Sequence, residues 1–250
     1  MLRVRGLTVG YGAEPVLEGL DLEVPAGKFV TLLGPSGSGK TSVLRCVTGL
    51  LQPQRGAIEL DVGASEIGFL FQDDALLPWR TVRQNVALGL RIRGAARAPA
   101  EQAAERWLAL LGLEGFGARY PRQLSGGQRK RVAIAQVLAL EPKLLLMDEP
   151  FASLDAIVRT RITQELLRWV ERNNLTVLLV THDLEEAISA SDTVYVLSQG
   201  PRAAMRARHD VPISRPRDLL EARRHPAFGS LLRSLWNDLS GEPAAVDSAM

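Results

Sequence analysis

The chain has 250 residues, of which 46% are hydrophobic and 23% charged, and 30 basic against 28 acidic side chains leave a formal net charge of +2. That length fits one large domain or two small ones, and so small a charge argues against nucleic-acid binding over the whole surface. The single cysteine, Cys46, excludes an internal disulfide framework. The chain has no apolar run long enough to span a bilayer and no signal-peptide pattern, so we expect a soluble cytoplasmic protein.

The first third of the chain alternates short β-like runs with glycine- and proline-containing turns. The strands expected there cover residues 2–9, 16–24, 29–33, 57–60 and 67–71. The run at 29–33 is continuously apolar, as expected of a strand buried on both faces. A helical pattern follows it from Lys40 to Leu50.

From residue 81 to 140 the hydrophobic period is helical, and afterwards short apolar runs again alternate with helical segments. We expect strands at 144–147, 175–180 and 193–197, the last of the chain, and helices at 157–173 and 184–190. Strand and helix alternate at both ends of the chain, with a helical insert between them. The fold class predicted is therefore α/β, with a mostly parallel core sheet.

The segment 201–225 holds seven arginines and three acidic residues, a local net charge of +4. The interpretation that we favour is a solvated cap of helix and loop. The alternative is a docking face for a partner or for lipid headgroups.

The run Gly34-Pro35-Ser36-Gly37-Ser38-Gly39-Lys40-Thr41, followed by Ser42, matches the phosphate-binding pattern G-x-x-x-x-G-K-[ST]. Its glycines let backbone N–H groups wrap an anion, and the helix beginning at Lys40 directs its positive dipole end at phosphate. Lys40 adds a point charge for the β- and γ-phosphates of a nucleotide. The Thr41 hydroxyl can bind Mg²⁺.

A second group of reactive side chains follows the apolar run 144–147, where Asp148 and Glu149 stand next to each other. Adjacent residues at a strand end point in different directions. Asp148 suits the metal-binding role of phosphate-loop NTPases, and Glu149 is then the general base for the attacking water.

The string Leu124-Ser125-Gly126-Gly127-Gln128 resembles the signature motif of ATP-binding cassette (ABC) proteins. The resemblance extends from Tyr11 to Leu197. It implies a RecA-like P-loop NTPase core with a mostly parallel sheet, an N-terminal antiparallel β subdomain and a helical signature subdomain. We expect one nucleotide-binding domain over 1–250, with its core at about 1–80 and 141–200, the helical subdomain at about 81–140 and a C-terminal tail at 201–250.

The same resemblance implies roles for further residues. Tyr11 would stack on adenine. Gln72 would be the Q-loop glutamine, which contacts Mg²⁺ or water. Residues 153–155 would form the D-loop, with Asp155 acting across a dimer interface. His182 would hydrogen-bond the γ-phosphate and the attacking water.

In the family, the signature motif of one subunit closes over the ATP that the phosphate loop of the other subunit holds. Backbone N–H groups of Ser125, Gly126 and Gly127, at the start of a helix, provide that second anion site. The resemblance therefore implies a head-to-tail homodimer with two ATP molecules at its interface, although a paralogue could take the place of one copy. Gln136 stands where the family usually has arginine, a departure that affects a local ion pair rather than the phosphate-facing residues.

Two segments resemble the nitrate/sulfonate/taurine importer ATPases: the segment 71–86, which contains Leu76-Leu77-Pro78-Trp79, and the segment 211–218. One interpretation of the apolar Leu76–Trp79 stretch is a role in the core. The other is a groove at Gln72–Val86 that receives a short cytoplasmic helix of a permease, with Trp79 as the anchor.

We therefore predict an ATP-hydrolysing subunit of an ABC importer, peripheral on the cytoplasmic face of the membrane, with ATP and Mg²⁺ as cofactors. Separate permease subunits and an external solute-binding protein would complete it, and nucleic acid would not be a partner. A nitrate-, sulfonate- or taurine-like solute is favoured. The alternatives are another small solute, such as a thiamine precursor, or a cassette ATPase that drives a non-transport partner. A simple phosphate-loop kinase has no use for the signature motif.

Overall fold

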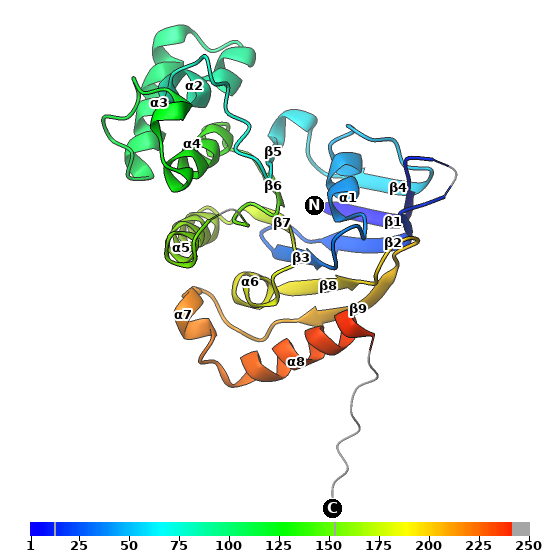
Figure 1. The fold of residues 1–250 in the computed structure, drawn as a ribbon. Coiled ribbons are helices and arrows are strands. Elements are labelled where there is room, and N and C mark those ends of the chain that lie inside the picture. The colour runs from blue at the N-terminus through cyan, green and yellow to red at the C-terminus, as the bar shows by residue number, and fades with distance from the viewer. Residues whose placement is uncertain (13, 153, 242–250) are drawn as a thin grey trace, which may run out of the picture. The chain divides into compact units, whose positions relative to one another are not determined.

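The computed structural model describes residues 1–12, 14–152 and 154–241. The chain divides into two compact units, which are described separately (Figure 1). The first unit comprises Met1–Asp61 and Val170–Met250, and the second unit comprises Val62–Trp169. Within the described residues, none of the helices combines the length and the apolar character that a membrane span requires.

The first unit begins with a small antiparallel sheet. Its strands are β1 (Leu2–Val9), β2 (Leu17–Val24) and β4 (Arg55–Leu60), in the order β2-β1-β4. Val4 at the centre lies opposite Leu22 on one side and Ile58 on the other. Alternate residues of β2 are buried, as expected of a sheet with one covered face. The predicted N-terminal antiparallel subdomain is confirmed.

The rest of the first unit is built on four further strands. These are β3 (Phe29–Leu33), β7 (Thr176–Thr181), β8 (Thr193–Leu197) and β9 (Met205–Asp210), in the order β7-β3-β8-β9. The first three run parallel, and every residue of β3 and β7 is buried. β9 pairs antiparallel with β8. The expectation that the last strand ends at residue 197 is therefore wrong, because β9 is an edge strand of charged and small residues without an apolar pattern.

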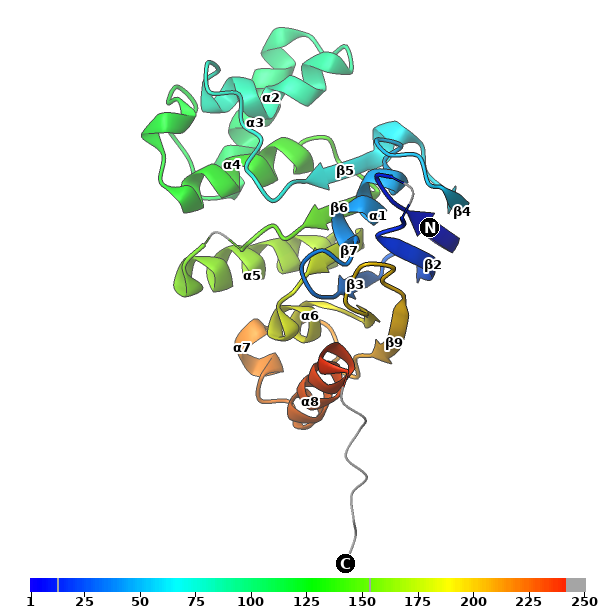
Figure 2. The same ribbon diagram turned by 45° about the vertical axis from the view of Figure 1, so that its right-hand side comes forward.

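The helices of the first unit are α1 (Lys40–Val47), α6 (Leu184–Ala190), α7 (Leu219–Ala222) and α8 (Pro226–Ser240). In both views of the ribbon, α6 and α8 lie near each other (Figure 2). Their contact is apolar, and Ile188 of α6 and Leu235 of α8 belong to one cluster with Val196 of β8. Burial of this cluster holds the C-terminal helix on the sheet.

The second unit is mainly helical. It contains two parallel strands, β5 (Ile67–Leu70) and β6 (Leu144–Asp148), and the helices α2 (Val82–Ile92), α3 (Arg97–Leu110), α4 (Gly126–Leu138) and α5 (Ala156–Arg172), whose last turn extends past residue 169. Short 3₁₀ turns lie at Ala64–Glu66 and Pro121–Gln123. Val86, Leu108 and Val132 join α2, α3 and α4 in one buried cluster. The predicted helical signature subdomain is confirmed.

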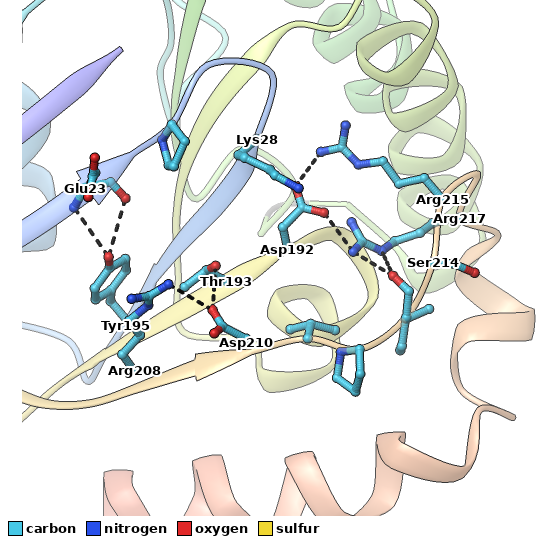
Figure 3. Close-up of a pocket in the computed structure, with 14 residues that line it drawn as sticks. Glu23, Lys28, Asp192, Thr193, Tyr195, Arg208, Asp210, Ser214, Arg215 and Arg217 are labelled. Carbon is cyan, nitrogen blue, oxygen red and sulfur yellow. Dashed lines mark hydrogen bonds and ion pairs between the residues drawn. The ribbon is translucent and has the colours of Figure 1, made fainter.

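The C-terminal segment is anchored in the first unit through Asp192. Arg215 Nη2 lies 2.6 Å from one carboxylate oxygen of Asp192 and Arg217 Nη2 lies 3.0 Å from the other (Figure 3). The backbone N–H of Phe29 also donates to Asp192, at 2.9 Å. Arg217 is only 4% exposed, and burial lowers the pKa of its guanidinium while Asp192 opposes that effect. The expectation of a solvated cap is therefore wrong for these two arginines, which line a cavity of about 650 Å³.

Removing the Asp192 carboxylate should destabilise the protein strongly, because Asp192 is the main group that opposes the cost of burying the Arg217 charge. We expect Asp192→Ala to lower the free energy of unfolding by about 3 kcal/mol. The matched control is Asp210→Asn, an exposed carboxylate of the same cavity that pairs with Arg208 at 3.1 Å. The control should cost less than about 0.5 kcal/mol in urea denaturation. Equal losses in the two variants would contradict the anchoring role.

Candidate functional site

The phosphate-loop motif connects β3 to α1 in the first unit. Gly37 and Gly39 have φ angles of +82° and +88°, a left-handed conformation that side chains disfavour. A Cβ on Gly39 would also lie 3.0 Å from the Cβ of Leu17. Ser38 Oγ donates to the Pro35 carbonyl at 2.9 Å and closes the turn. The sequence therefore folds here into the compact loop that the motif predicts.

Lys40 is the first residue of α1, and its side chain lies inside the loop. The residue is 5% exposed, and its Nζ donates to the carbonyls of Gly34 at 2.8 Å and Pro35 at 2.9 Å. The ammonium group and the N-terminal end of α1 place positive charge at the same point. This arrangement suits the binding of a phosphate chain.

Tyr11 lies against the first turns of α1. Its hydroxyl is 3.0 Å from Ser42 Oγ and accepts from Arg45 Nη1 at 3.3 Å. The structure thus brings together two predicted site residues, Tyr11 and Ser42, and adds Arg45, for which the sequence carried no signal. The Tyr11 residue remains 64% exposed, so its ring is available for stacking on a planar group.

His182 directly follows β7, and the parallel register sets Thr181 opposite Leu33 of β3. Gly34 and His182 consequently leave neighbouring strands at the same edge of the sheet. His182 is exposed, and the next residue, Asp183, caps α6 by accepting from the N–H groups of Glu185 and Glu186. The cap determines where the chain turns after β7.

In the second unit, parallel pairing sets Leu70 of β5 opposite Met147 of β6. Gln72, shortly after β5, and the pair Asp148–Glu149, at the end of β6, therefore lie where neighbouring strands end, at one edge. Asp148 is buried, Glu149 is half-buried and Gln72 is exposed. Glu149 has a φ of +42°, which costs about 1–3 kcal/mol for a residue with a side chain and is typical of functional sites.

The signature motif forms the N-terminus of α4. Ser125 Oγ accepts from the Gln128 N–H at 3.3 Å, and the Gln128 side chain accepts from the Ser125 N–H at 2.9 Å. This capping box fixes the first turn of α4. The second glycine is required sterically, because a Cβ on Gly127 would lie 2.7 Å from Val158 Cγ1 of α5. Helix N-termini suit anion binding in general, because their N–H groups lack partners within the helix.

A cavity of about 630 Å³ lies in front of this helix end. Ser125–Gln128 and Asp155 line it together, so the structure brings the predicted signature and D-loop residues to one place. Asp155 also caps α5 by accepting from the Val158 N–H at 3.0 Å. Residue 153, part of the predicted D-loop, lies outside the described residues. Arg131 and Arg161 line the cavity as well, and no motif in the sequence marked them for this role.

Mg²⁺ was predicted at Thr41, Gln72 and Asp148. The described residues contain no group of three or more histidine, cysteine or acidic side chains that would hold a metal alone. Mg²⁺ usually binds through one or two carboxylates together with substrate phosphates. One buried carboxylate at Asp148, with hydroxyl and amide oxygens at the other two positions, fits that chemistry.

Comparison with known proteins agrees with this geometry. The ABC transporter family profile matches residues 17–152, more than half of the chain. The chain is 45% identical over 205 residues to a Synechocystis sulfate/thiosulfate import ATP-binding protein, covering 79% of this chain and 58% of the relative. It is 43% identical over 206 residues to the taurine import ATP-binding protein of Escherichia coli O157:H7, covering 80% and 81%.

Among solved structures, the chain is similar to the ATP-binding cassette MJ0796, determined as a dimer in a post-hydrolysis state with ADP and Pi. The TM-score is 0.74 with 31% sequence identity, covering 86% of this chain and all of the other. A second neighbour, the cassette cbiO1 of Clostridium perfringens, gives a TM-score of 0.73 at 27% identity and covers 84% of this chain and 88% of the other. The P-loop NTPase fold class is confirmed, and the chain belongs to the ABC transporter family.

Proposed function

We propose that this chain is the ATP-hydrolysing subunit of an ABC importer and that it works as a head-to-tail dimer. One observation carries the proposal: the chain has a phosphate loop with Lys40 inside it and also a capped helix N-terminus at Ser125 that opens onto a cavity. A phosphate-loop enzyme that acts alone needs only the first of these anion sites. The names of the relatives, import ATP-binding proteins, support the same conclusion.

In this proposal the nucleotide binds first to the first unit. The N–H groups of the loop 34–41 hold the phosphates, Lys40 balances their charge, and Tyr11 stacks on adenine. Ser42 keeps the Tyr11 hydroxyl beside α1. Thr41, Asp148 and Gln72 would hold Mg²⁺, which would neutralise negative charge on the phosphates.

Hydrolysis requires a base and a group that positions the water. Glu149 accepts a proton from the attacking water, and His182 hydrogen-bonds the γ-phosphate and that water. Ser125, Gly126 and Gly127 of the partner copy, with Asp155, close over the same nucleotide. Hydrolysis replaces a shared ATP by ADP and phosphate, which repel each other, and the dimer opens.

In the segment proposed to dock on a permease, Asn85 hydrogen-bonds the backbone of the loop 77–81. This side chain is fully buried, accepts from the Leu77 N–H at 2.7 Å and donates to the carbonyls of Leu77, Arg80 and Thr81 at 3.0–3.1 Å. Trp79 is left 71% exposed by this loop. Leu76 packs on the helical cluster, in line with the core interpretation, whereas the exposure of Trp79 supports the docking interpretation.

The named solutes of the relatives are sulfate or thiosulfate and taurine, all of which carry an oxidised sulfur group. We propose a solute of this class, taken up through permease subunits with the ATPase peripheral at the cytoplasmic face. Solute choice belongs to the permease and an external binding protein. Affinity purification of tagged Glu149→Gln from detergent-solubilised membranes with ATP tests this. A polytopic membrane protein in the eluate supports import, whereas a soluble complex alone supports a non-transport module.

The Glu149→Gln variant should retain Mg-ATP binding and lose turnover, because the amide cannot accept the proton of the attacking water. We expect ATP hydrolysis to fall at least about a hundredfold, within the range of acid–base contributions. The variant should also elute as a dimer with ATP in size-exclusion chromatography. Glu185→Gln, a half-buried glutamate paired with Arg223, is the matched control and should behave as wild type. Normal hydrolysis by Glu149→Gln would refute the base assignment.

Trp79→Ala should weaken association with the permease and leave nucleotide binding unchanged. An exposed tryptophan that anchors an interface typically contributes 2 kcal/mol or more, so retention of the permease should fall roughly tenfold or further. Trp236→Ala provides the control, since Trp236 of α8 is also exposed, at 60%. Quantitative co-purification of the permease measures the effect. Equal retention by the two variants would place the docking surface elsewhere.

A further inference from the structure

Lys130 is a buried lysine in the signature helix α4, one helical turn beyond Ser125. Its side chain is fully buried in a chain with only four lysines. Its Nζ donates to the Gln72 carbonyl at 3.0 Å and to the Phe71 carbonyl at 3.4 Å. It also lies 3.1 Å from Asp74 Oδ1. All three ammonium protons therefore have an acceptor, and every acceptor belongs to the segment that carries Gln72.

The segment 71–77 has neither helix nor strand structure, so its backbone groups need partners from elsewhere. Lys130 supplies partners for two consecutive carbonyls. The other Asp74 oxygen lies 3.4 Å from Arg129 Nε, and Arg129 also donates to the Leu124 carbonyl at 2.8 Å. Ala75 is held at a φ of +52°, a conformation that persists only where surrounding contacts impose it.

These contacts link two parts of the site that the sequence separates widely. α4 begins with the Ser125 cap, and its next turn holds the main chain of Gln72. An apolar side chain could fill the space of Lys130, but it would leave the two carbonyls and the Asp74 carboxylate without their hydrogen-bond donor. The lysine thus fixes a position as well as filling a volume.

We propose that Lys130 is a positioning residue that holds the Gln72 main chain on the signature helix, so that the Gln72 side chain reaches the bound nucleotide in one fixed orientation. The proposal rests on the proposed ATPase function, and it extends that function to two residues outside the motifs, Lys130 and Asp74. The signature helix and the Gln72 segment then move together. A displacement of Ser125 is transmitted to Gln72 through three short contacts.

Lys130→Met in the full-length protein tests this, because methionine keeps an apolar stem of similar length but cannot donate. We expect kcat for ATP hydrolysis to fall about tenfold or more, because the Gln72 side chain would be displaced from its working position. KM for Mg-ATP should change less than about threefold. Lys143→Met removes the other lysine of the second unit, which pairs with Glu66 at 2.6 Å on the surface, and should leave both constants unchanged. A rise in KM without a fall in kcat would overturn the proposal.

The decisive comparison combines Lys130→Met with Gln72→Ala. If Lys130 acts through the Gln72 side chain, it loses its effect once that side chain is gone, so the double variant should have the kcat of Gln72→Ala within about twofold. Multiplicative losses would show that Lys130 supports the fold generally and would refute a positioning role.

Two further measurements keep the test independent of folding yield and of ATPase activity. Asp74→Asn keeps the shape of the segment and weakens the ionic contact, so it replaces Lys130→Met if that variant does not fold, and it should lower kcat about threefold. Amide hydrogen exchange at residues 72–77 should be faster in either variant than in Lys143→Met. Unchanged exchange would overturn the proposal that Lys130 holds this segment on α4. Absence of turnover in the wild-type protein would instead refute the ATPase function itself.

Discussion

The register of parallel strands decides which side chains can share a site in this protein. Leu33 lies opposite Thr181, so the phosphate loop and His182 leave the sheet together, and Leu70 lies opposite Met147, so Gln72 and Asp148 do the same. A shift of one residue in either pairing would point these side chains away from one another. The continuous burial of β3, β6 and β7 maintains the register, because no residue in them can be exposed without loss of core packing.

Around these strand ends, local hydrogen bonds set the direction of each chemical group. The Ser125–Gln128 capping box shapes the signature end of α4, and Asp183 and Asp155 cap the helices after β7 and β6. Each cap satisfies N–H groups that a helix start leaves open. The reactive side chains therefore project from elements whose ends are fixed. Asn85 likewise hydrogen-bonds the backbone of a loop without regular structure, and Trp79 of that loop is exposed.

Buried charges connect segments that are distant in the chain. Asp192 joins the C-terminal Arg215 and Arg217 to the start of β3, and Lys130 joins α4 to the Gln72 segment. Removal of one member of such a group reduces the compensation of a buried charge, so these contacts are sensitive to substitution. They also show that the basic composition of 201–225 does not by itself indicate a binding surface, because Arg217 is buried and Arg215 is half-buried against Asp192.

The sequence by itself determined the motifs: the phosphate loop, Asp148 and Glu149 after a buried run, and the signature string, together with the alternation of strands and helices. Each of these depends on neighbours in the chain, where periodicity and residue type are direct signals. Only the tertiary structure decided the contacts of Lys130 with Gln72, the burial of Arg217 and the pairing of β9. The physical reason is that these three features depend on residues far apart in the chain. Polar contacts between such residues produce no periodic pattern in the sequence.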